Sequence, residues 1–212
     1  MTATKTRERI MLTAIEMFNR KGSTNVSTAQ LASEMQISPG NLYYYFNNKE
    51  HVIRSIWKEI ITPQSTKLFY GDGIENSPVA IVEFFLGLAR HTYSYRFFYL
   101  DLPALAQNDP QLWDLYRTRA EKVMERIDIV FDRWVELGIM SCMAPNERKL
   151  LIENLWLLSQ TGIKYSQLFK KNAQHIEICN DVIQHLYALI CPHITEEIHL
   201  SILAEFKTKA NF

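Results

Sequence analysis

The sequence predicts an all-α protein. Apolar residues recur at helical spacing along nearly the whole chain, almost no segment alternates as a strand would, and capping residues separate the helical segments. The chain also has no internal repeat and no low-complexity segment. These observations indicate successive helices joined by turns.

The first predicted helix covers residues 4–21 and ends before Gly22. Its apolar face is formed by Ile10, Ala14, Met17 and Phe18. Two short helices follow between residues 26 and 48. Ser27 or Thr28 caps the first of them. The second has Ser38 as its N-cap and Pro39 at its first position, where a missing N–H costs nothing.

A longer helix is predicted from Asn47 or Asn48 to about residue 70, with a bend near Pro63 and a break at the GDG of residues 71–73. The remaining helices are predicted from their starts and stops. Ser77-Pro78 starts a helix over 78–92, and a second covers about 95–107. A long helix runs from Asp109-Pro110 to Gly138, and two more cover about 146–171 and 174–190. A last short helix after Pro192 is capped by Thr195, with Glu196 and Glu197 favourably placed near its N-terminus.

The composition limits the class of protein. Hydrophobic residues make up 47% and charged residues 22% of the 212 residues, which is typical of a soluble globular protein. No apolar run reaches the roughly 18 residues of a membrane span, and the N-terminus lacks the apolar core of a signal peptide. Cys142, Cys179 and Cys191 form no disulfide framework. We therefore expect a cytoplasmic protein with reduced thiols and no membrane partner.

The charge is unevenly distributed along the chain although the formal net charge is zero. Residues 1–60 carry eight Lys/Arg against five Glu, a balance of +3, and the remainder carries a balance of −3. A mildly basic N-terminal segment on an acidic body is compatible with DNA binding.

The most informative stretch is ISPGNLYYYFNNK at residues 37–49. At 100° per residue, Leu42 and Phe46 share the apolar face of the short helix and Tyr44 lies opposite them. Gly40 and Asn41 lie on the side of Tyr44. This surface suits the DNA major groove, since a glycine allows close approach, an asparagine pairs with adenine, and phenol hydroxyls reach phosphates or base edges.

The tyrosines on either side of that surface have a second interpretation. Tyr43 and Tyr45 flank the buried face, so both are also explained as amphipathic packing residues with hydrated hydroxyl groups.

This segment resembles the N-terminal helix-turn-helix of the TetR/AcrR family of transcriptional regulators over about residues 5–55. The matching residues are Leu31-Ala32, Ile37-Ser38, Gly40, Leu42-Tyr43, Phe46 and Lys49-Glu50. The resemblance implies a three-helix DNA-binding domain at 1–48 and a larger helical effector-binding and dimerisation domain at 49–212. It implies a ligand-released repressor that binds a palindromic operator in double-stranded DNA as a homodimer, without a cofactor.

The resemblance also implies the positions that contact DNA. Those at Tyr43 and Lys49 touch phosphates in the family, and others lie near bases. The full set of expected DNA-binding residues is Thr28, Ser38, Pro39, Gly40, Asn41, Tyr43, Tyr44, Tyr45 and Lys49. Three residues depart from the family pattern: Tyr45 replaces a frequent histidine, Gln36 replaces a glycine in the turn, and Ser23 replaces an aromatic residue after Gly22.

Residues 78–134 are rich in aromatic side chains, most of which are expected in the core. The resemblance implies a cavity between these middle helices for a hydrophobic or amphipathic small-molecule effector. The expected ligand-binding residues are His91, Tyr95, Phe98, Trp113, Tyr116, Trp134 and Tyr165.

The helices at 146–171 and 174–190 carry two apolar stripes, and the resemblance implies that they form a four-helix bundle with their copies in a dimer. One stripe consists of Leu151, Leu155, Leu158, Gly162 and Tyr165, and the other of Ile178, Val182, Leu186 and Leu189.

The sequence also bears on three alternative functions. An enzyme is not expected, because GxSxG, glycine-rich phosphate-loop and HExxH signatures are absent. An interaction protein that has lost DNA binding is disfavoured by the groove-facing residues. A metal-responsive regulator would use a C-terminal stretch that lacks clean zinc spacing. Its potential ligands are His175, Glu177, Cys179, His185, Cys191, His193 and His199.

Overall fold

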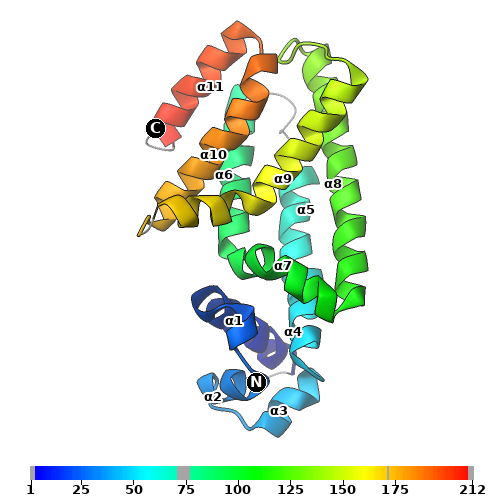
Figure 1. The fold of residues 1–212 in the computed structure, drawn as a ribbon, viewed down its shortest axis with the longest axis vertical. Helices are drawn as coiled ribbons and strands as arrows, with labels where there is room; N and C mark the ends of the chain where they lie inside the picture. The colour runs from blue at the N-terminus through cyan, green and yellow to red at the C-terminus, as the bar shows by residue number, and fades with distance from the viewer. Residues whose placement is uncertain (1–2, 71–76, 171, 210–212) are drawn as a thin grey trace. The chain divides into compact units, whose positions relative to one another are not determined.

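The computed structural model describes residues 3–70, 77–170 and 172–209, where helices are joined by turns and the one β-type contact is an isolated antiparallel bridge between Met140 and Ile194 (Figure 1). The α-helices are α1 (Ala3–Lys21), α2 (Thr28–Glu34), α3 (Pro39–Tyr45), α4 (Lys49–Ile56), α5 (Thr62–Tyr70), α6 (Pro78–Ser94), α7 (Arg96–Asn108), α8 (Pro110–Glu136), α9 (Pro145–Phe169), α10 (His175–Ile190) and α11 (Glu196–Lys209). A π-helical segment, Trp57–Ile61, joins α4 to α5, and short 3-10 segments occupy Ser23–Asn25 and Cys191–His193. The all-α prediction is confirmed.

The chain divides into two compact units. The first consists of residues 1–64 and 94–116, and the second of residues 65–93 and 117–212. The first unit therefore contains α4 and α7 in addition to the predicted three-helix segment 1–48. The compact units are defined by packing and not by contact with DNA. A boundary at residue 48 between a DNA-binding and an effector-binding domain therefore stays a prediction.

The first unit is built around the apolar face of α1. Ile10, Ala14, Met17 and Phe18 are all buried, as the spacing predicts. The helix ends at Lys21, and Gly22 adopts a positive φ of 81° while its N–H donates to the carbonyl of Phe18 at 2.8 Å. Glycine occupies this left-handed conformation without the steric cost of a Cβ.

The short helices α2 and α3 start at side-chain caps. Ser27 and Gln30 form a reciprocal capping box at α2, and Ser38 accepts the N–H of Asn41 at 3.1 Å at α3. Gln36 between the two helices has a φ of 56°. Gln36 thus adopts a left-handed conformation although it is not glycine.

The long helix predicted after Asn48 is not uniform. Asn48 caps α4 by accepting the N–H of His51 at 2.8 Å, but Trp57–Ile61 widens into a π-helical segment before α5 begins. Pro63 explains this change, because its ring would clash with the carbonyl of Glu59 in a regular α-helix and it has no N–H to donate. The predicted break at residues 71–73 lies outside the described residues.

A polar cluster ties the start of α4 to α7 in the first unit. Ser23 is fully buried, and both its N–H and its hydroxyl donate to Oδ2 of Asp101 at 2.9 and 2.5 Å. Lys49 donates from Nζ to the carbonyl of Ser23 at 2.9 Å. The serine that departs from the family pattern thus carries hydrogen bonds where an aromatic ring would only pack.

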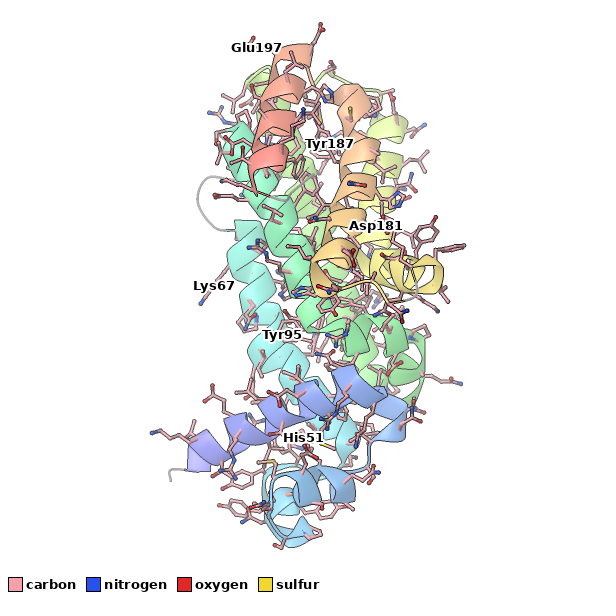
Figure 2. All side chains as sticks on the ribbon, turned by 90° about the vertical axis from the view of Figure 1, so that its left-hand side faces the viewer. His51, Lys67, Tyr95, Asp181, Tyr187 and Glu197 are labelled. Atoms are coloured by element: carbon pink, nitrogen blue, oxygen red, sulfur yellow. The ribbon has the colours of Figure 1, made fainter. Side chains whose placement is uncertain are left out.

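The second unit has its own apolar core, formed by α6, α8, α9, α10 and α11 with the end of α5. Helices α9 and α10 run side by side (Figure 1). Gly162 lies at their contact, where an added Cβ would come within 3.2 Å of a methyl group of Val182. On α10 the carboxylate of Asp181, labelled in Figure 2, accepts Nζ of Lys170 at 2.6 Å.

The apolar stripes of α9 and α10 were expected to pack against a second copy of the chain. Most of their residues are instead buried within the single chain, which corrects that expectation. Six of them are buried in the core of the second unit: Leu151, Leu155, Gly162, Ile178, Val182 and Leu186. Leu158 and Leu189 pack partly buried against that core, whereas Tyr165 is exposed. Periodicity identified the apolar faces correctly but could not tell whether this chain or a copy covers them.

The ends of the remaining helices follow the predicted signals, with one correction. Asp109 accepts the N–H of Leu112 at 3.2 Å at the start of α8, and Gly138 ends that helix region with a φ of 69°. The hydroxyl of Thr195 instead donates to the carbonyl of Gly138 at 3.0 Å, so it links two segments rather than capping α11. Within the described residues, no helix is both long and apolar enough to cross a bilayer.

Candidate functional site

Helix α3 presents a tyrosine-rich surface to solvent. Tyr44 is 78% exposed and Tyr43 is 50% exposed, while Leu42 and Phe46 are fully buried. Tyr45 is intermediate, and its ring meets that of Tyr44 edge-on at 4.9 Å. The predicted orientation of the helix is confirmed, and Tyr44 is its outermost aromatic side chain.

The hydroxyl groups of Thr28 and Tyr43 lie 3.1 Å apart and link the start of α2 to α3. Either group can donate in this pair, and each keeps capacity for a further hydrogen bond. The contact therefore fixes the angle between the two short helices and leaves both oxygens available for a phosphate.

The first turn of α3 is exposed at every position. Ser38, Pro39, Gly40 and Asn41 all face solvent. A Cβ built on Gly40 would meet only Oγ of Ser38, at 3.9 Å. Within the described part of the chain, no neighbouring atom is close enough to require glycine at this position.

Part of the basic charge of the N-terminal segment is engaged within the first unit. Arg7 pairs with Glu59 and also donates to Ser55, and the side chain of Lys49 is tied to Ser23 as described above. Two further ion pairs join Arg20 to Glu34 and Arg54 to Asp109. Four of the eight basic side chains counted in residues 1–60 are thus engaged within the unit. The ammonium group of Lys49 has three N–H donors, so its bond to the carbonyl of Ser23 leaves it donors for a further acceptor.

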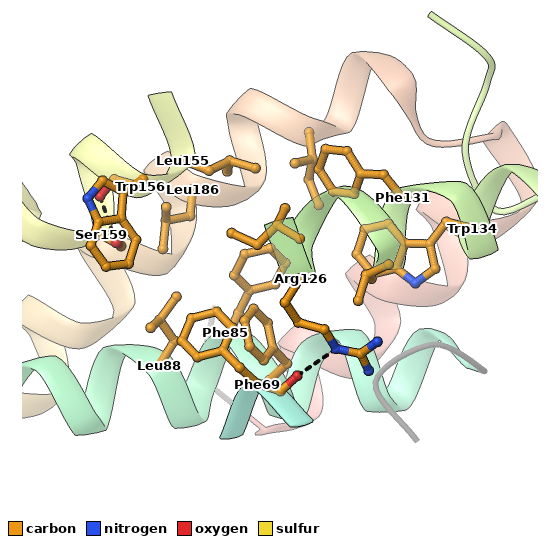
Figure 3. A pocket seen from close by; sticks show the side chains of 14 residues that line it. Phe69, Phe85, Leu88, Arg126, Phe131, Trp134, Leu155, Trp156, Ser159 and Leu186 are labelled. Atoms are coloured by element: carbon orange, nitrogen blue, oxygen red, sulfur yellow. Dashed lines mark hydrogen bonds between the residues drawn. The ribbon is translucent and has the colours of Figure 1, made fainter. Parts of the chain in front are cut away.

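A second candidate site is an aromatic cavity inside the second unit (Figure 3). Its volume is about 50 Å³. The lining residues come from α5, α6, α8, α9 and α10 and are Phe69, Phe84, Phe85, Leu88, Arg126, Ile127, Val130, Phe131, Trp134, Leu155, Trp156, Ser159, Leu186 and Ile190. Arg126 is the charged residue among them, and its Nε donates to the carbonyl of Phe69 at 3.0 Å.

The expected ligand-binding residues are not gathered around this cavity, and of the seven only Trp134 lines it. In the first unit Phe98 stacks on Trp57 at 4.6 Å, and Tyr116 and Trp113 extend the same ring cluster. Tyr95 donates its hydroxyl to Gln64 at 2.7 Å. Aromatic content alone could not separate rings that pack a core from rings that line a cavity.

The remaining two expected ligand residues lie elsewhere in the second unit. Tyr165 is exposed and contacts the rings of Phe169 and His185. Burial, with a smaller contribution from the nearby Arg119, lowers the pKa of His91 to about 4. His91 is therefore neutral at pH 7 in the folded protein. Neither His91 nor Tyr165 lines the cavity, and a ligand contact by either residue stays a prediction.

Arg126 is a charged lining residue of the cavity that sequence reasoning missed. It lies on α8 beside the apolar stripe of Val123, Ile127 and Val130, so a cation borders a helical face that is otherwise apolar. A charged residue next to an apolar stripe is unusual, and that pattern in the sequence could have identified Arg126.

The C-terminal histidines and cysteines do not assemble into a metal site. In the described residues, no group of three or more His, Cys, Asp or Glu side chains is placed to hold an ion. His175 stacks on Tyr93 at 4.0 Å. Nδ1 of His199 lies 2.7 Å from the hydroxyl of Tyr187 and 3.4 Å from Sγ of Cys191. The metal-responsive alternative gains no support from this geometry.

The chain matches family models over most of its length. Residues 10–56 match the model described as bacterial regulatory proteins of the tetR family, and residues 65–200 match the TetR model described as a bacterial transcriptional repressor. Among curated proteins, the chain is 27% identical over 126 residues to the HTH-type transcriptional regulator UidR of Escherichia coli K12. That match covers 58% of this chain and spans 63% of the relative's length.

Solved structures are similar over almost the whole chain. A TetR-family transcriptional regulator from Marinobacter aquaeolei VT8 is 27% identical, with a TM-score of 0.86 and coverage of 98% of both chains. A transcriptional regulator from Saccharomonospora viridis in complex with choline is 21% identical, with a TM-score of 0.70. It covers 91% of this chain and 99% of its own, and at that identity it shows the shared fold alone.

Proposed function

Because the chain belongs to the TetR family of bacterial regulatory proteins, we propose that it is a DNA-binding transcriptional repressor that is released from its operator by a small molecule. Helix α3 reads the major groove, and the cavity of the second unit holds the effector. An enzymatic activity is not part of the proposal, since the family and the matched relatives are transcriptional regulators.

The observation that carries the DNA-reading role is the exposed surface of α3. Tyr44, Asn41 and Gly40 point away from the core, and their donors and acceptors can meet base edges. Tyr43 and Thr28 supply adjacent hydroxyl groups for phosphates. Ser38 and Pro39 set the first turn of α3, and Tyr45 at the end of α3 and Lys49 at the start of α4 complete the proposed contact set.

We further propose a homodimer through α9 and α10. The apolar side chains that remain exposed on these helices include Leu168 at 71% and Phe169 at 73% exposure. Leu150 and Leu157 lie on the same face of α9 as Leu168 by helical spacing, and Tyr165 and Ile176 are exposed as well. A row of exposed large apolar side chains is the pattern of a protein interface. A two-fold dimer would place two copies of α3 on a palindromic operator.

Selection from a pool of random duplexes tests the DNA-binding proposal, because the operator is unknown. The expected product is an inverted repeat whose half-sites are separated by about one helical turn or more, roughly 34–36 Å per turn. Enrichment of no sequence over the starting pool at low salt would contradict DNA binding, and a single unrepeated half-site would contradict binding as a dimer.

The dimer is tested separately by sedimentation of variants. Leu168→Glu or Phe169→Glu should shift the chain towards monomer, because a carboxylate would be buried in an apolar interface. Leu200→Glu is the matched control, since Leu200 is a comparably exposed leucine (61%) on α11, outside the proposed interface. An unchanged mass for both α9 variants would place the interface elsewhere.

A further inference from the structure

The turn that follows α1 is bound to α7 within the first unit. Ser23 is fully buried, and its N–H and its hydroxyl both donate to Oδ2 of Asp101, at 2.9 and 2.5 Å. Hydrogen bonds to a carboxylate are shorter and stronger than those between neutral groups. Because one bond comes from the backbone and the other from the side chain, the carboxylate of Asp101 holds Ser23 in one conformation.

A second set of contacts joins α1 to the start of α7 without Asp101. Oδ1 of Asn19 accepts the N–H of Phe97 at 3.1 Å, and its Nδ2 donates to the carbonyl of Ser94 at 2.7 Å. The rings of Phe18 and Phe97 lie 5.2 Å apart. These contacts remain when the carboxylate of Asp101 is removed, so the packing of α1 on α7 does not depend on Asp101 alone.

The carbonyl of Ser23 in turn holds the ammonium group of Lys49. Nζ of Lys49, the first residue of α4, donates to this carbonyl at 2.9 Å. The bond uses one of the three N–H donors of the ammonium group and leaves the others for a phosphate. A continuous series of hydrogen bonds therefore connects the carboxylate of Asp101, through Ser23, to the cation that is proposed to contact DNA.

A small cavity beside Lys49 shows what the bond to Ser23 prevents. The cavity measures about 60 Å³, and Lys49 lines it together with the acidic residues Glu50 and Asp109. An ammonium group released from the carbonyl of Ser23 would be attracted to these carboxylates, and its long side chain would regain rotamer freedom. Both effects oppose a phosphate contact. The bond to Ser23 therefore prepares Lys49 for DNA.

We propose that Asp101 is a positioning residue for operator binding, which acts through Ser23 to hold the ammonium group of Lys49 in place for a DNA phosphate. This inference deepens the proposed function and rests on it, because it takes Lys49 to contact the operator. It also gives a role to the serine at residue 23, which departs from the aromatic residue of the family pattern.

The negative charge of Asp101 makes this role distinguishable from a simple electrostatic effect. Removal of a carboxylate makes the first unit less negative, which by itself would strengthen binding to polyanionic DNA. The positioning role predicts the opposite result. Without Asp101 the side chain of Lys49 must be ordered during binding, and the ordering of one long side chain weakens affinity by roughly three- to tenfold.

The test is a double-mutant cycle between residues 101 and 49, measured as affinity for a duplex selected by the parent chain, at one salt concentration. Asp101→Ala should weaken binding by roughly three- to tenfold when Lys49 is present. In the Lys49→Ala background the same substitution should change the affinity by less than about twofold, because no ammonium group is left to position. Equal losses in both backgrounds indicate a general structural effect and overturn the proposal, as does tighter binding by Asp101→Ala alone.

Two further variants separate the hydrogen bonds of Asp101 from its charge. Asp101→Asn keeps an acceptor oxygen for both donors of Ser23 but carries no charge, so it should recover most of the affinity lost in Asp101→Ala. Asp114→Ala is the matched charge control, since it removes an exposed carboxylate from the α8 part of the same unit, and its effect should be the same with and without Lys49. An Asp101→Asn chain that binds as weakly as Asp101→Ala overturns the role of the acceptor.

Ser23→Ala keeps the proposal testable if Asp101→Ala does not fold. This variant loses the hydroxyl but keeps the backbone N–H that donates to Asp101. It should therefore weaken operator binding by less than Asp101→Ala, roughly two- to threefold, and only when Lys49 is present. A loss that is independent of Lys49, or no loss, overturns the proposal.

The same measurements separate this inference from the function on which it rests. Selection that enriches no duplex contradicts DNA binding itself, and the inference with it. If a duplex is selected but Lys49→Ala binds it as the parent does, DNA binding stands and the positioning role is overturned, because there is no contact to position. A loss in Asp101→Ala that depends on Lys49 supports both.

Discussion

The buried ion pair between Arg54 and Asp109 gives the sharpest stability prediction for the first unit. Asp109 is 4% exposed, and its two carboxylate oxygens accept Nη1 of Arg54 at 2.7 and 2.8 Å. Oδ1 also accepts the N–H of Leu112 at the start of α8. One carboxylate therefore neutralises a guanidinium and caps a helix.

Asp109→Ala removes both roles. Loss of one partner of a buried pair costs about 3–5 kcal/mol, and loss of an N-cap costs about 1 kcal/mol, partly for the same atoms. The side chain of Arg54 is 22% exposed, so water reaches part of the abandoned guanidinium. We therefore expect the free energy of unfolding to fall by about 3 kcal/mol. Asp109→Asn keeps the cap and one acceptor, so a loss of about 1.5 kcal/mol is expected.

Urea unfolding at one fixed protein concentration measures these losses. Glu34→Ala is the matched control, because Glu34 pairs with Arg20 at 3.5 Å and their side chains are 45% and 61% exposed. That variant should cost less than about 1 kcal/mol. If Asp109→Ala costs no more than Glu34→Ala, the pair does not hold α4 to the start of α8 and the reasoning is refuted.

Three further predictions address the DNA contact, a buried histidine and the thiols. Lys49→Ala should reduce the slope of log K against log salt by about one unit, measured by titration of a selected operator, whereas an unchanged slope would leave Lys49 only its bond to Ser23. His91 takes up its proton near pH 4 when folded but near 6.5 when unfolded, so the unfolding free energy should fall as pH drops through this window, by up to about 1.4 kcal/mol per unit. His91→Asn should flatten that pH dependence, and an equally steep curve would contradict the low pKa. Because burial raises the pKa of the Cys179 thiol to about 11, iodoacetamide at pH 8 should modify the exposed Cys142 first, as mass spectrometry of digests would show; equal rates would mean that Cys179 is accessible.

Much of the fold follows from local signals in the sequence. Ser38 with Pro39, Ser77 with Pro78, and Gly22 mark helix ends because caps and stops act through neighbouring backbone groups. The helical wheel of α3 was equally reliable, since two fully buried residues fix the orientation of a two-turn helix.

Long-range partners could not be predicted in the same way. The bond from Lys49 to Ser23 joins residues 26 positions apart, and Arg126 meets Phe69 across 57 positions. The apolar stripes of α9 and α10 illustrate the same limit, because a periodic pattern shows that a face is covered without showing what covers it. For the same reason, of the aromatic residues expected around a ligand only Trp134 lines the cavity, while Phe98, Trp113 and Tyr116 form a ring cluster in the first unit.

The most direct test of the central claim, that α3 reads the operator, compares selected duplex sequences for three variants with those of the parent chain. Tyr44→Ala and Asn41→Ala should each change the preferred bases at defined positions of the half-site, with a loss of about 1–3 kcal/mol of discrimination for a lost base contact. Asn108→Ala, at an exposed asparagine in the last turn of α7, should return the parental profile. Identical profiles for all three variants and the parent would contradict base reading by α3.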